Sequence, residues 1–391
     1  MPEWKSTCLG DICTTNKDSY SSKDNWKIVN YLDTGSITEN KITELQYIDI
    51  ETDKLPSRAR RKVRKDSILY STVRPNQLHY GIIKELVDNL LVSTGFTVID
   101  VDTNKAIPEF IYYILTQKNT TEQLQAIAEQ SVSTYPSIKA TDIENLKLKL
   151  PNLAIQKKIV AILDTIDSKI RQNEKINNNL EQQAKVLYKD WFFDFSPFSS
   201  DGNLPNGWHF GTVGDIIQLH DSKRVPLSGA ERDKMAKVYP YYGATSLMDY
   251  VDNYLFDGIY LLLGEDGTVV DSLGFPILQY VYGQFWVNNH AHIITGKEGF
   301  SVEELYLFFS LTNIKSIVTG AVQQKVSQQN LKKVPAIIPS KQALSAFDEI
   351  IQPIFAQIRN LRDENANLSQ LRDTLLPKLM SGELDVSDID L

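Results

Sequence analysis

The sequence has little of what would indicate secretion, metal binding or membrane insertion. Only two of its 391 residues are cysteine, Cys8 and Cys13. No second pair of Cys or His stands at a spacing that would complete a tetrahedral zinc site. The longest apolar run, residues 305–311, is far shorter than the roughly 20 residues that span a bilayer. The amino terminus has no basic segment followed by an apolar stretch. We therefore expect a cytoplasmic, non-membrane protein in a reducing environment.

Motifs for nucleotide-dependent catalysis are also missing. There is no P-loop and no Gly-rich cofactor loop paired with an Asn/Asp-Pro-Pro-aromatic segment, and residues 240–242 and 264–267 only approach these patterns. The histidines lack triad spacing. His290 and His292 would share one face of a strand, where metal ligation is conceivable but a structural or base-contacting role is the better interpretation. We expect no catalytic residue, no metal and no cofactor in this chain.

Net charge argues against a nucleic-acid-binding protein, because affinity for phosphates normally rests on a positive surface. The chain carries 41 basic and 49 acidic residues, a formal charge of −8. The excess is uneven: residues 1–195 carry 26 of each sign, whereas residues 196–391 carry 15 basic and 23 acidic residues. Any DNA-binding surface must therefore be found locally.

An internal repeat has a period near half the chain, and such a repeat decides the fold. A shift of 188 positions places Pro151 on Pro339 and Leu187 on Leu375, with no gap over some fifty residues. A shift of 204 positions places residues 10–12 on 214–216. The two halves begin and end alike, whereas their middles differ.

The repeated end of each half predicts a long helix with a heptad seam. The seam positions are 163, 166, 170, 173, 177, 180, 184 and 187 in the first half, and 351, 354, 358, 361, 365, 368, 372 and 375 in the second. Pro353 is expected in the first turns, and Pro377 at the end of its helix. The two helices most simply cover each other, although each could be covered by its own domain. Asn177 and Asn365 are equivalent polar interruptions, and we expect them to meet and fix the register of an antiparallel pair.

The remaining segments predict mixed helix and strand. Strands are expected at 66–73, 94–99, 258–263 and 290–294, and helices at 108–115 and 301–309. We predict an α+β protein in which two mixed α/β domains, related by pseudo-two-fold symmetry, are separated by two long helices forming an antiparallel coiled coil. The predicted ranges are 1–150 for the first domain, 151–195 for the central helix, 196–339 for the linker and second domain, and 340–391 for the distal helix and tail.

One segment is strongly basic, because residues 58–65 hold six cations and no acid. Arg and Lys neutralise phosphates, while Arg, Asn and Gln can pair with base edges. A solvated basic loop is the alternative here, and core tyrosines and ordinary turns are the alternative in the second half. The predicted DNA contacts are Arg58, Arg60, Arg61, Lys62, Arg64, Lys65, Ser71, Thr72, Arg74, Gln77, His79, Lys223, Arg224, Tyr241, Tyr242, Asn288, Asn289, His290, Gln324 and Lys325.

Several stretches resemble the specificity subunits of type I restriction–modification systems, namely residues 4–12, 187–195 and 371–384. Residues 239–245, 256–267 and 285–292 resemble one class of target-recognition domain in that family. The resemblance covers the whole chain, and the order of domain, helix, domain, helix agrees with it. It implies two target-recognition domains that each read one half of a split DNA site, with the helices setting the separation of the half-sites.

The resemblance also implies partners. These are double-stranded DNA, two methyltransferase subunits that bring S-adenosylmethionine and modify adenine, and restriction/translocase subunits that bring ATP, in the cytoplasm of a bacterium or archaeon. The motifs of residues 239–245 and 285–292 have no counterpart in residues 1–150, so the target should be asymmetric. One rival is a coiled-coil scaffold with two interaction domains and no DNA function. A second rival, a fused restriction–methylation enzyme, is disfavoured by the missing motifs.

Overall fold

The chain forms two compact units. The computed structural model describes residues 4–131, 135–199, 201–320 and 323–389. Unit 1 consists of Met1–Arg171 and Asn365–Leu391, and unit 2 is Gln172–Glu364. Unit 1 is therefore discontinuous in sequence, while unit 2 is one uninterrupted segment. Among the described residues, no helix is long and apolar enough to cross a membrane.

Two long helices contribute to both units. Helix α4 spans Leu153–Phe192 and helix α9 spans Lys341–Ser381, which are 40 and 41 residues long. All sixteen predicted seam positions are buried or half-buried, so the heptad pattern is confirmed. The expected end at Pro377 is wrong, because α9 continues to Ser381. Pro353 likewise lies well inside α9 rather than in its first turns. Both prolines are exposed, so the carbonyl groups that lose an N–H partner can bind water instead.

Contacts within each unit show that α4 and α9 run antiparallel. In unit 1, Leu163 near the start of α4 shares a hydrophobic cluster with Leu379 near the end of α9. In unit 2, Phe192 at the end of α4 packs edge-on against Phe347 near the start of α9, with ring centroids 4.9 Å apart. The start of one helix thus packs on the end of the other, as the repeated seam predicted.

The described residues of unit 1 form two four-stranded sheets and two pairs of strands. The first sheet has the order β6-β3-β10-β7, with mixed pairing, and the second the order β2-β11-β8-β9, all antiparallel. The strands are β1 (Lys5–Cys8), β2 (Cys13–Thr15), β3 (Ile28–Leu32), β4 (Ile37–Thr38), β5 (Lys41–Ile42), β6 (Gln46–Asp49), β7 (Ala59–Lys62), β8 (Ile68–Ser71), β9 (Tyr80–Ile82), β10 (Leu90–Ser93), β11 (Phe96–Val101) and β12 (Lys147–Leu150).

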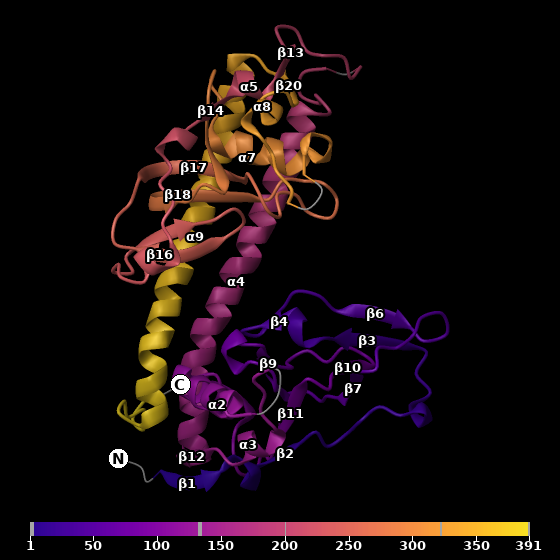
Figure 1. The fold of residues 1–391 in the computed structure, drawn as a ribbon, viewed down its shortest axis with the longest axis vertical. Coiled ribbons are helices and arrows are strands. Elements are labelled where there is room, and N and C mark those ends of the chain that lie inside the picture. The colour runs from indigo at the N-terminus through magenta and orange to yellow at the C-terminus, as the bar shows by residue number, and fades with distance from the viewer. Residues whose placement is uncertain (1–3, 132–134, 200, 321–322, 390–391) are drawn as a thin grey trace. The chain divides into compact units, whose positions relative to one another are not determined.

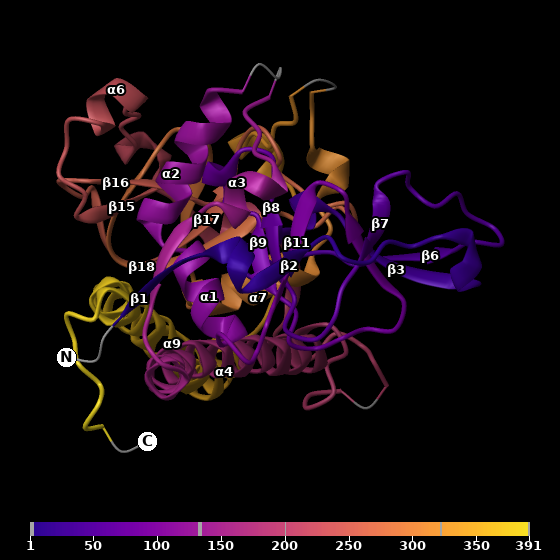
Figure 2. The ribbon, with the colours of Figure 1, turned by 90° about the horizontal axis from the view of Figure 1, so that it is seen from below.

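In the described part of unit 1, the helices besides α4 and α9 are α1 (Pro108–Leu115), α2 (Lys118–Glu129) and α3 (Ala140–Glu144). They lie beside the β2-β11-β8-β9 sheet, whereas the β6-β3-β10-β7 sheet extends away from α4 (Figures 1 and 2). The predicted strands at 66–73 and 94–99 and the helix at 108–115 are confirmed as β8, β11 and α1. Strand β7, which carries part of the basic segment, is an edge strand of the β6-β3-β10-β7 sheet.

Among its described residues, unit 2 is built on one six-stranded sheet, with the order β14-β19-β17-β18-β15-β16, and one separate strand pair, β13 with β20. The strands are β13 (His209–Thr212), β14 (Ile217–Leu219), β15 (Tyr239–Tyr242), β16 (Leu247–Val251), β17 (Phe256–Gly264), β18 (Leu278–Val287), β19 (Ala291–Gly296) and β20 (Pro335–Ile338). The helices are α5 (Val213–Ile216), α6 (Gly229–Arg232), α7 (Val302–Leu311) and α8 (Gln328–Leu331). The predicted strands at 258–263 and 290–294 are confirmed as β17 and β19.

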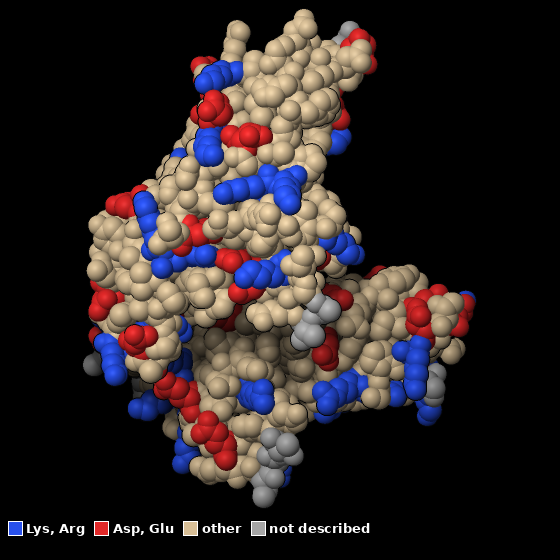
Figure 3. Space-filling model, turned by 45° about the horizontal axis from the view of Figure 1, so that its top comes forward, with Lys and Arg blue, Asp and Glu red and all other residues tan. Residues whose placement is uncertain are grey.

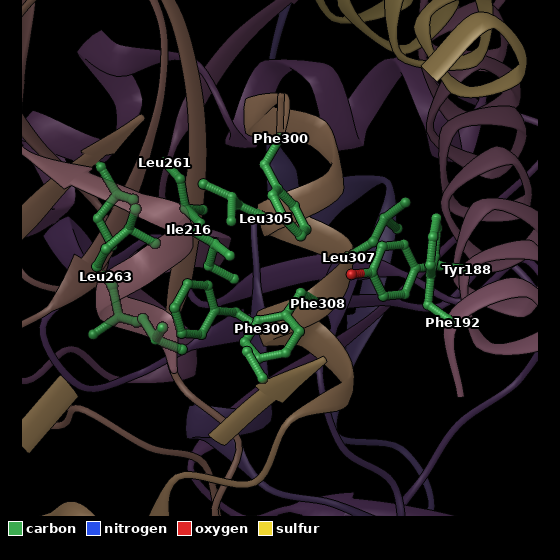
Figure 4. Packing of buried hydrophobic residues seen from close by; sticks show 14 of the residues in the cluster. Tyr188, Phe192, Ile216, Leu261, Leu263, Phe300, Leu305, Leu307, Phe308 and Phe309 are labelled. Atoms are coloured by element: carbon green, nitrogen blue, oxygen red, sulfur yellow. The ribbon is translucent and has the colours of Figure 1, made fainter. Parts of the chain in front are cut away.

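Helix α7 is the centre of the unit 2 core. Its sequence is apolar nearly all round, which is typical of a buried helix, and Ser301 caps its start by accepting a hydrogen bond from the Glu304 backbone N–H at 3.2 Å. Figure 4 shows Leu305 and Phe309 directed toward Leu261 and Leu263 of the sheet, and Phe308 and Leu307 beside Tyr188 of α4. The core thus joins the six-stranded sheet to the α4–α9 pair inside unit 2.

Candidate nucleic-acid interface

Four segments that the sequence singled out in unit 2 come together in the structure. Arg224, which follows β14, donates a hydrogen bond from Nη1 to Glu265 Oε2 at 2.6 Å and to the Ala291 carbonyl at 2.8 Å. Lys325 Nζ lies 3.4 Å from Glu265 Oε1. Residues around 224, 265, 290 and 325 therefore form one site, although they are widely separated in the sequence.

The interior of this site is a charged network, which we call the ionic cluster: Asp221, Arg224, Glu265 and His292. His292 is fully buried, and its Nδ1 lies 2.6 Å from Asp221 Oδ2. Burial is the largest single effect and opposes ionisation of Asp221, but the hydrogen bonds from His292 and the Ile293 backbone N–H, together with the charge of Arg224, hold the pKa of Asp221 below its usual value. The pKa of Glu265 is likewise lowered: burial is the largest single effect and raises it, but the hydrogen bonds from Arg224 and Lys325 and the charge of Arg224 together outweigh burial.

Three members of the ionic cluster are residue types that bind metals. The nearest ligand atoms of Asp221, Glu265 and His292 lie within 4.8 Å of one another. Yet each ring nitrogen of His292 already faces an oxygen atom, and Arg224 and Lys325 place two positive charges against the carboxylates. These contacts describe an ion-pair network rather than a metal centre, because a cation would have to displace them.

Around the ionic cluster, several predicted contact residues reach the surface. Lys223, Asn289, Gln324 and Lys325 are exposed. His290 is partly exposed, and its Nδ1 lies 2.6 Å from Asp266 Oδ1. These five side chains give the site cationic and amide groups of the kinds that contact phosphates and base edges.

Three other predicted contact residues of unit 2 are buried or half-buried in the protein interior. Tyr241 is 1% exposed, and its hydroxyl accepts a hydrogen bond from the Leu227 backbone N–H at 3.0 Å. Asn288 is buried, and Tyr242 is half-buried against Phe285. We therefore remove Tyr241 and Asn288 from the proposed DNA contacts, because a buried side chain offers no surface to a base or phosphate. Arg224 is also largely occupied by the ionic cluster.

In unit 1, the basic segment divides into paired and exposed cations. Lys62 forms an ion pair with Asp24 and lies 5.2 Å from the centroid of the Trp26 ring. Arg64 forms ion pairs with Asp18 and with Asp100. Arg61 is half-buried, and burial lowers its pKa. By contrast Arg58, Arg60 and Lys65 are exposed, and no ion pair involves them in the described part of the chain.

The segment after β8 holds the other predicted contacts of unit 1. Ser71 is buried, and its hydroxyl donates a hydrogen bond to the Val73 carbonyl, so we remove Ser71 from the proposed contacts. The Thr72 hydroxyl donates a hydrogen bond to the Gly95 carbonyl. His79 Nδ1 lies 2.7 Å from the Ile37 carbonyl oxygen. Arg74 and Gln77 are exposed, and the Arg74 guanidinium lies 5.1 Å from the centroid of the Tyr135 ring.

Arg74 has an unusual backbone. Its φ is +47°, and that of Leu78, four residues later, is +58°. Residues other than Gly rarely adopt this left-handed backbone region. Backbone strain of this kind is found disproportionately at functional sites. Sequence reasoning proposed Arg74 as a contact but did not single out Tyr135, because nothing in the sequence links the two residues.

The predicted helix-register residues belong to different units. Asn365 Nδ2 donates to the Ile170 carbonyl at 3.3 Å within unit 1. Asn173, a seam residue that is fully buried, donates to Glu364 Oε2 at 2.7 Å within unit 2. The pairing of Asn177 with Asn365 would join the two units and stays a prediction.

The charge distribution agrees with small local sites. On the face seen in Figure 3, Lys and Arg side chains are interspersed with Asp and Glu over the surface. No extended region of one sign covers that face, as expected for a chain of net charge −8. The candidate contacts therefore depend on a few exposed cations and amides rather than on a broad positive surface.

Comparisons with known proteins agree with this organisation. The family model described as "Type I restriction modification DNA specificity domain" matches residues 1–182 and again residues 205–370. The HindI specificity subunit of Haemophilus influenzae is 26% identical over 98% of this chain and 100% of its own length. The MjaIX specificity subunit of Methanocaldococcus jannaschii is 24% identical over 97% of this chain and 93% of its own length.

A solved structure shows the same fold. The S subunit of a type I restriction–modification system from M. genitalium superimposes with a TM-score of 0.56 at 16% identity, and the match covers 97% of this chain and 96% of the other. The family model matches most of the chain in two copies, one for each half of the internal repeat. This chain therefore belongs to the family of type I restriction–modification specificity subunits.

Proposed function

We propose that this specificity subunit reads a bipartite, asymmetric DNA sequence and positions methyltransferase partners on it. The observation that carries the proposal is the double match of the specificity-domain model to two halves whose ends repeat and whose middles differ. Because the two target-recognition domains differ while the two helices are alike, we expect the two DNA half-sites to differ in sequence. The chain itself carries out no catalytic step.

The contacts proposed within unit 1 are Arg58, Arg60, Lys65, Arg74 and Gln77. These side chains are exposed, and the first three lie outside the ion pairs that occupy their neighbours. Arg and Gln can each form two parallel hydrogen bonds to a base edge, whereas Lys acts mainly on phosphates. The contacts proposed within unit 2 are Lys223, Asn289, His290, Gln324 and Lys325, which surround the ionic cluster.

The helices supply a physical means of spacing the half-sites. An α-helix rises 1.5 Å per residue, so one of about 40 residues is about 60 Å long, which is comparable with one to two turns of duplex. The separation of the two half-sites should then depend on helix length. The polar seam residues Asn173, bonded to Glu364, and Asn365, bonded to the Ile170 carbonyl, would hold the register, because a buried Asn in a helix seam fixes alignment at some cost in stability.

The partners follow from the same proposal. Two methyltransferase subunits would bring S-adenosylmethionine for adenine methylation, and restriction/translocase subunits would bring ATP, in a bacterial or archaeal cytoplasm. The net charge of −8 means that this subunit supplies few of the cations that bind phosphates, which supports a complex in which the partners add further DNA contacts. Weak binding by the isolated subunit at physiological salt is the expected result.

Methylome sequencing of host cells with and without the gene tests this proposal. One bipartite motif with an unread spacer should lose its methylation in the deletion strain. A footprint of the subunit with its methyltransferase partner should then show two protected segments on that motif. An unchanged methylome together with an unprotected duplex would support the scaffold without a DNA function.

A further inference from the structure

A short backbone bridge closes the loop after β8 in unit 1. The Ile138 N–H donates a hydrogen bond to the Thr72 carbonyl at 2.8 Å, and the Arg74 N–H donates one to the Pro136 carbonyl at 2.9 Å. The loop after β8 and the segment before α3 therefore hold each other in place at two points, although they are far apart in the sequence.

Unit 2 contains the same bridge at the equivalent place. Its strand order β14-β19-β17-β18 corresponds to β2-β11-β8-β9 of unit 1, with antiparallel pairing throughout. After β17, the Val326 N–H donates to the Glu265 carbonyl at 2.8 Å, and the Gly267 N–H donates to the Gln324 carbonyl at 3.0 Å. The 188-position shift of the internal repeat pairs the segments before α3 and α8. Arg74 and Gly267 therefore occupy the same position of the repeated fold.

This shared position has a left-handed backbone in both units. The φ angle is +87° at Gly267 and +47° at Arg74. Gly adopts this region freely, whereas a residue with a Cβ does so at a cost, and the proline that follows Arg74 favours an extended backbone instead. A Cβ added at Gly267 would meet no atom within 4 Å, so the position is open in unit 2. Unit 1 thus carries a long cationic side chain where the fold accepts glycine, which indicates that the side chain has a role.

The ring of Tyr135 holds the guanidinium group of Arg74. The Arg74 Cζ atom lies 5.1 Å from the ring centroid, and Tyr135 is 56% exposed. Within the described ranges, Arg74 takes part in no ion pair. An arginine held over an aromatic face keeps its N–H donors for a planar partner, and it loses less freedom when it binds. Its fork of donors matches the O6 and N7 acceptors that guanine presents in the major groove.

We propose that Arg74 reads a guanine in the DNA half-site of unit 1, and that Tyr135 is the positioning residue that holds its guanidinium group for this contact. The inference rests on the proposed function and assigns Arg74 to a base rather than to a phosphate. The paired bonds to guanine require the planar fork of Arg, which Lys does not reproduce. In unit 2 the same bridge carries Gln324 and Lys325, so the repeated element offers different groups to the second half-site.

The first test compares duplexes that differ by one base pair. The chain, in complex with its methyltransferase partner, is titrated by fluorescence anisotropy with the bipartite duplex identified by methylome sequencing. Further duplexes replace each G·C pair by A·T in turn. Arg74→Lys should bind the original duplex at least about tenfold more weakly and lose discrimination at one G·C pair of one half-site, while the other half-site is still read. Wild-type discrimination at every G·C pair in Arg74→Lys would assign Arg74 to a phosphate and overturn the inference.

Two variants of Tyr135 test the positioning role. Tyr135→Phe keeps the ring and should keep the wild-type discrimination. Tyr135→Ala should weaken discrimination about two- to fivefold at the base pair that Arg74→Lys affects. Added to Arg74→Lys, it should have no further effect at that pair, because both residues act through one contact. Wild-type discrimination in Tyr135→Ala, or a loss at a different pair, overturns the positioning role.

Arg74→Gly separates DNA reading from damage to the fold. Gly suits the left-handed backbone, as in unit 2, so the urea midpoint of unfolding should stay the same or rise while discrimination at that pair is lost. A lower midpoint would give Arg74 a structural role and overturn the inference. Arg171→Lys, an exposed residue of α4, is the matched control and should keep all discrimination. A wild-type complex that binds every duplex equally, or none, refutes the proposed function itself, whereas failure of the inference alone leaves both half-sites read.

Discussion

The salt dependence of DNA binding distinguishes the exposed cations of unit 1 from the paired ones. Affinity for B-DNA falls with salt with a slope of about −0.9 per neutralised phosphate on logarithmic axes. Replacing Arg58, Arg60 and Lys65 together by Gln removes three exposed cations. If each contacts one phosphate, the slope becomes less steep by about 2.7. Between about 50 and about 200 mM salt, the wild type should then lose about fortyfold more affinity than the triple variant.

The matched control replaces Lys62 and Arg64 by Gln. Ion pairs with Asp24 and Asp18 already compensate their charges, so the slope should change by less than about 1. Fluorescence anisotropy with the methyltransferase complex and its bipartite duplex, repeated at several salt concentrations, gives both slopes. Equal slopes for the wild type and the triple variant, or an equally large change in the control, would refute the division into exposed and paired cations.

Three other predictions concern the stability of unit 2, measured by urea unfolding with tryptophan fluorescence. Arg224→Ala should cost about 3–5 kcal/mol, because Glu265 loses the partner of a largely buried ion pair; a loss below 1 kcal/mol would contradict this. Phe355→Ala should cost about 3–5 kcal/mol, since this ring is fully buried in the core, and full-length thermal stability should fall in step. Burial raises the pKa of Glu304 to about 8, so the folded state binds the proton more tightly than the unfolded chain. Stability should therefore fall as the pH rises from about 4.5 through about 8, and Glu304→Gln should abolish that fall.

The helices could be predicted from the sequence because their signal is local and repeated. A seam of period 3.5 specifies which face is covered, and a gapless repeat indicates that two such faces occur in one chain. The same pattern does not specify the detailed contacts of the polar seam positions. Asn173 is fully buried and bonded to Glu364, although Asn177 and Asn365 look like the natural pair in the sequence. Hydrogen bonds of this kind depend on the rotation of each helix, which packing decides.

The candidate site could be predicted only in outline. Composition identified the segments around residues 224, 290 and 325, and the structure brings them together. The bond between Asp221 and His292 joins residues 71 positions apart, and no local pattern marks such a pair. Composition also does not show which side chains are exposed to solvent. Tyr241 was therefore predicted as a DNA contact although its side chain is buried.

The discontinuity of unit 1 has a consequence for synthesis on the ribosome. Translation completes the whole of unit 2 before the Asn365–Leu391 segment of unit 1 emerges. Until then, Ile159 and Leu163 of α4 lack the cover that Leu379 and Met380 of α9 later provide. Domains generally fold as they leave the ribosome, amino-terminal part first, but here the amino-terminal unit should be the last to finish. The nascent chain thus carries an open apolar stripe for most of its synthesis, and chaperone binding should concentrate there.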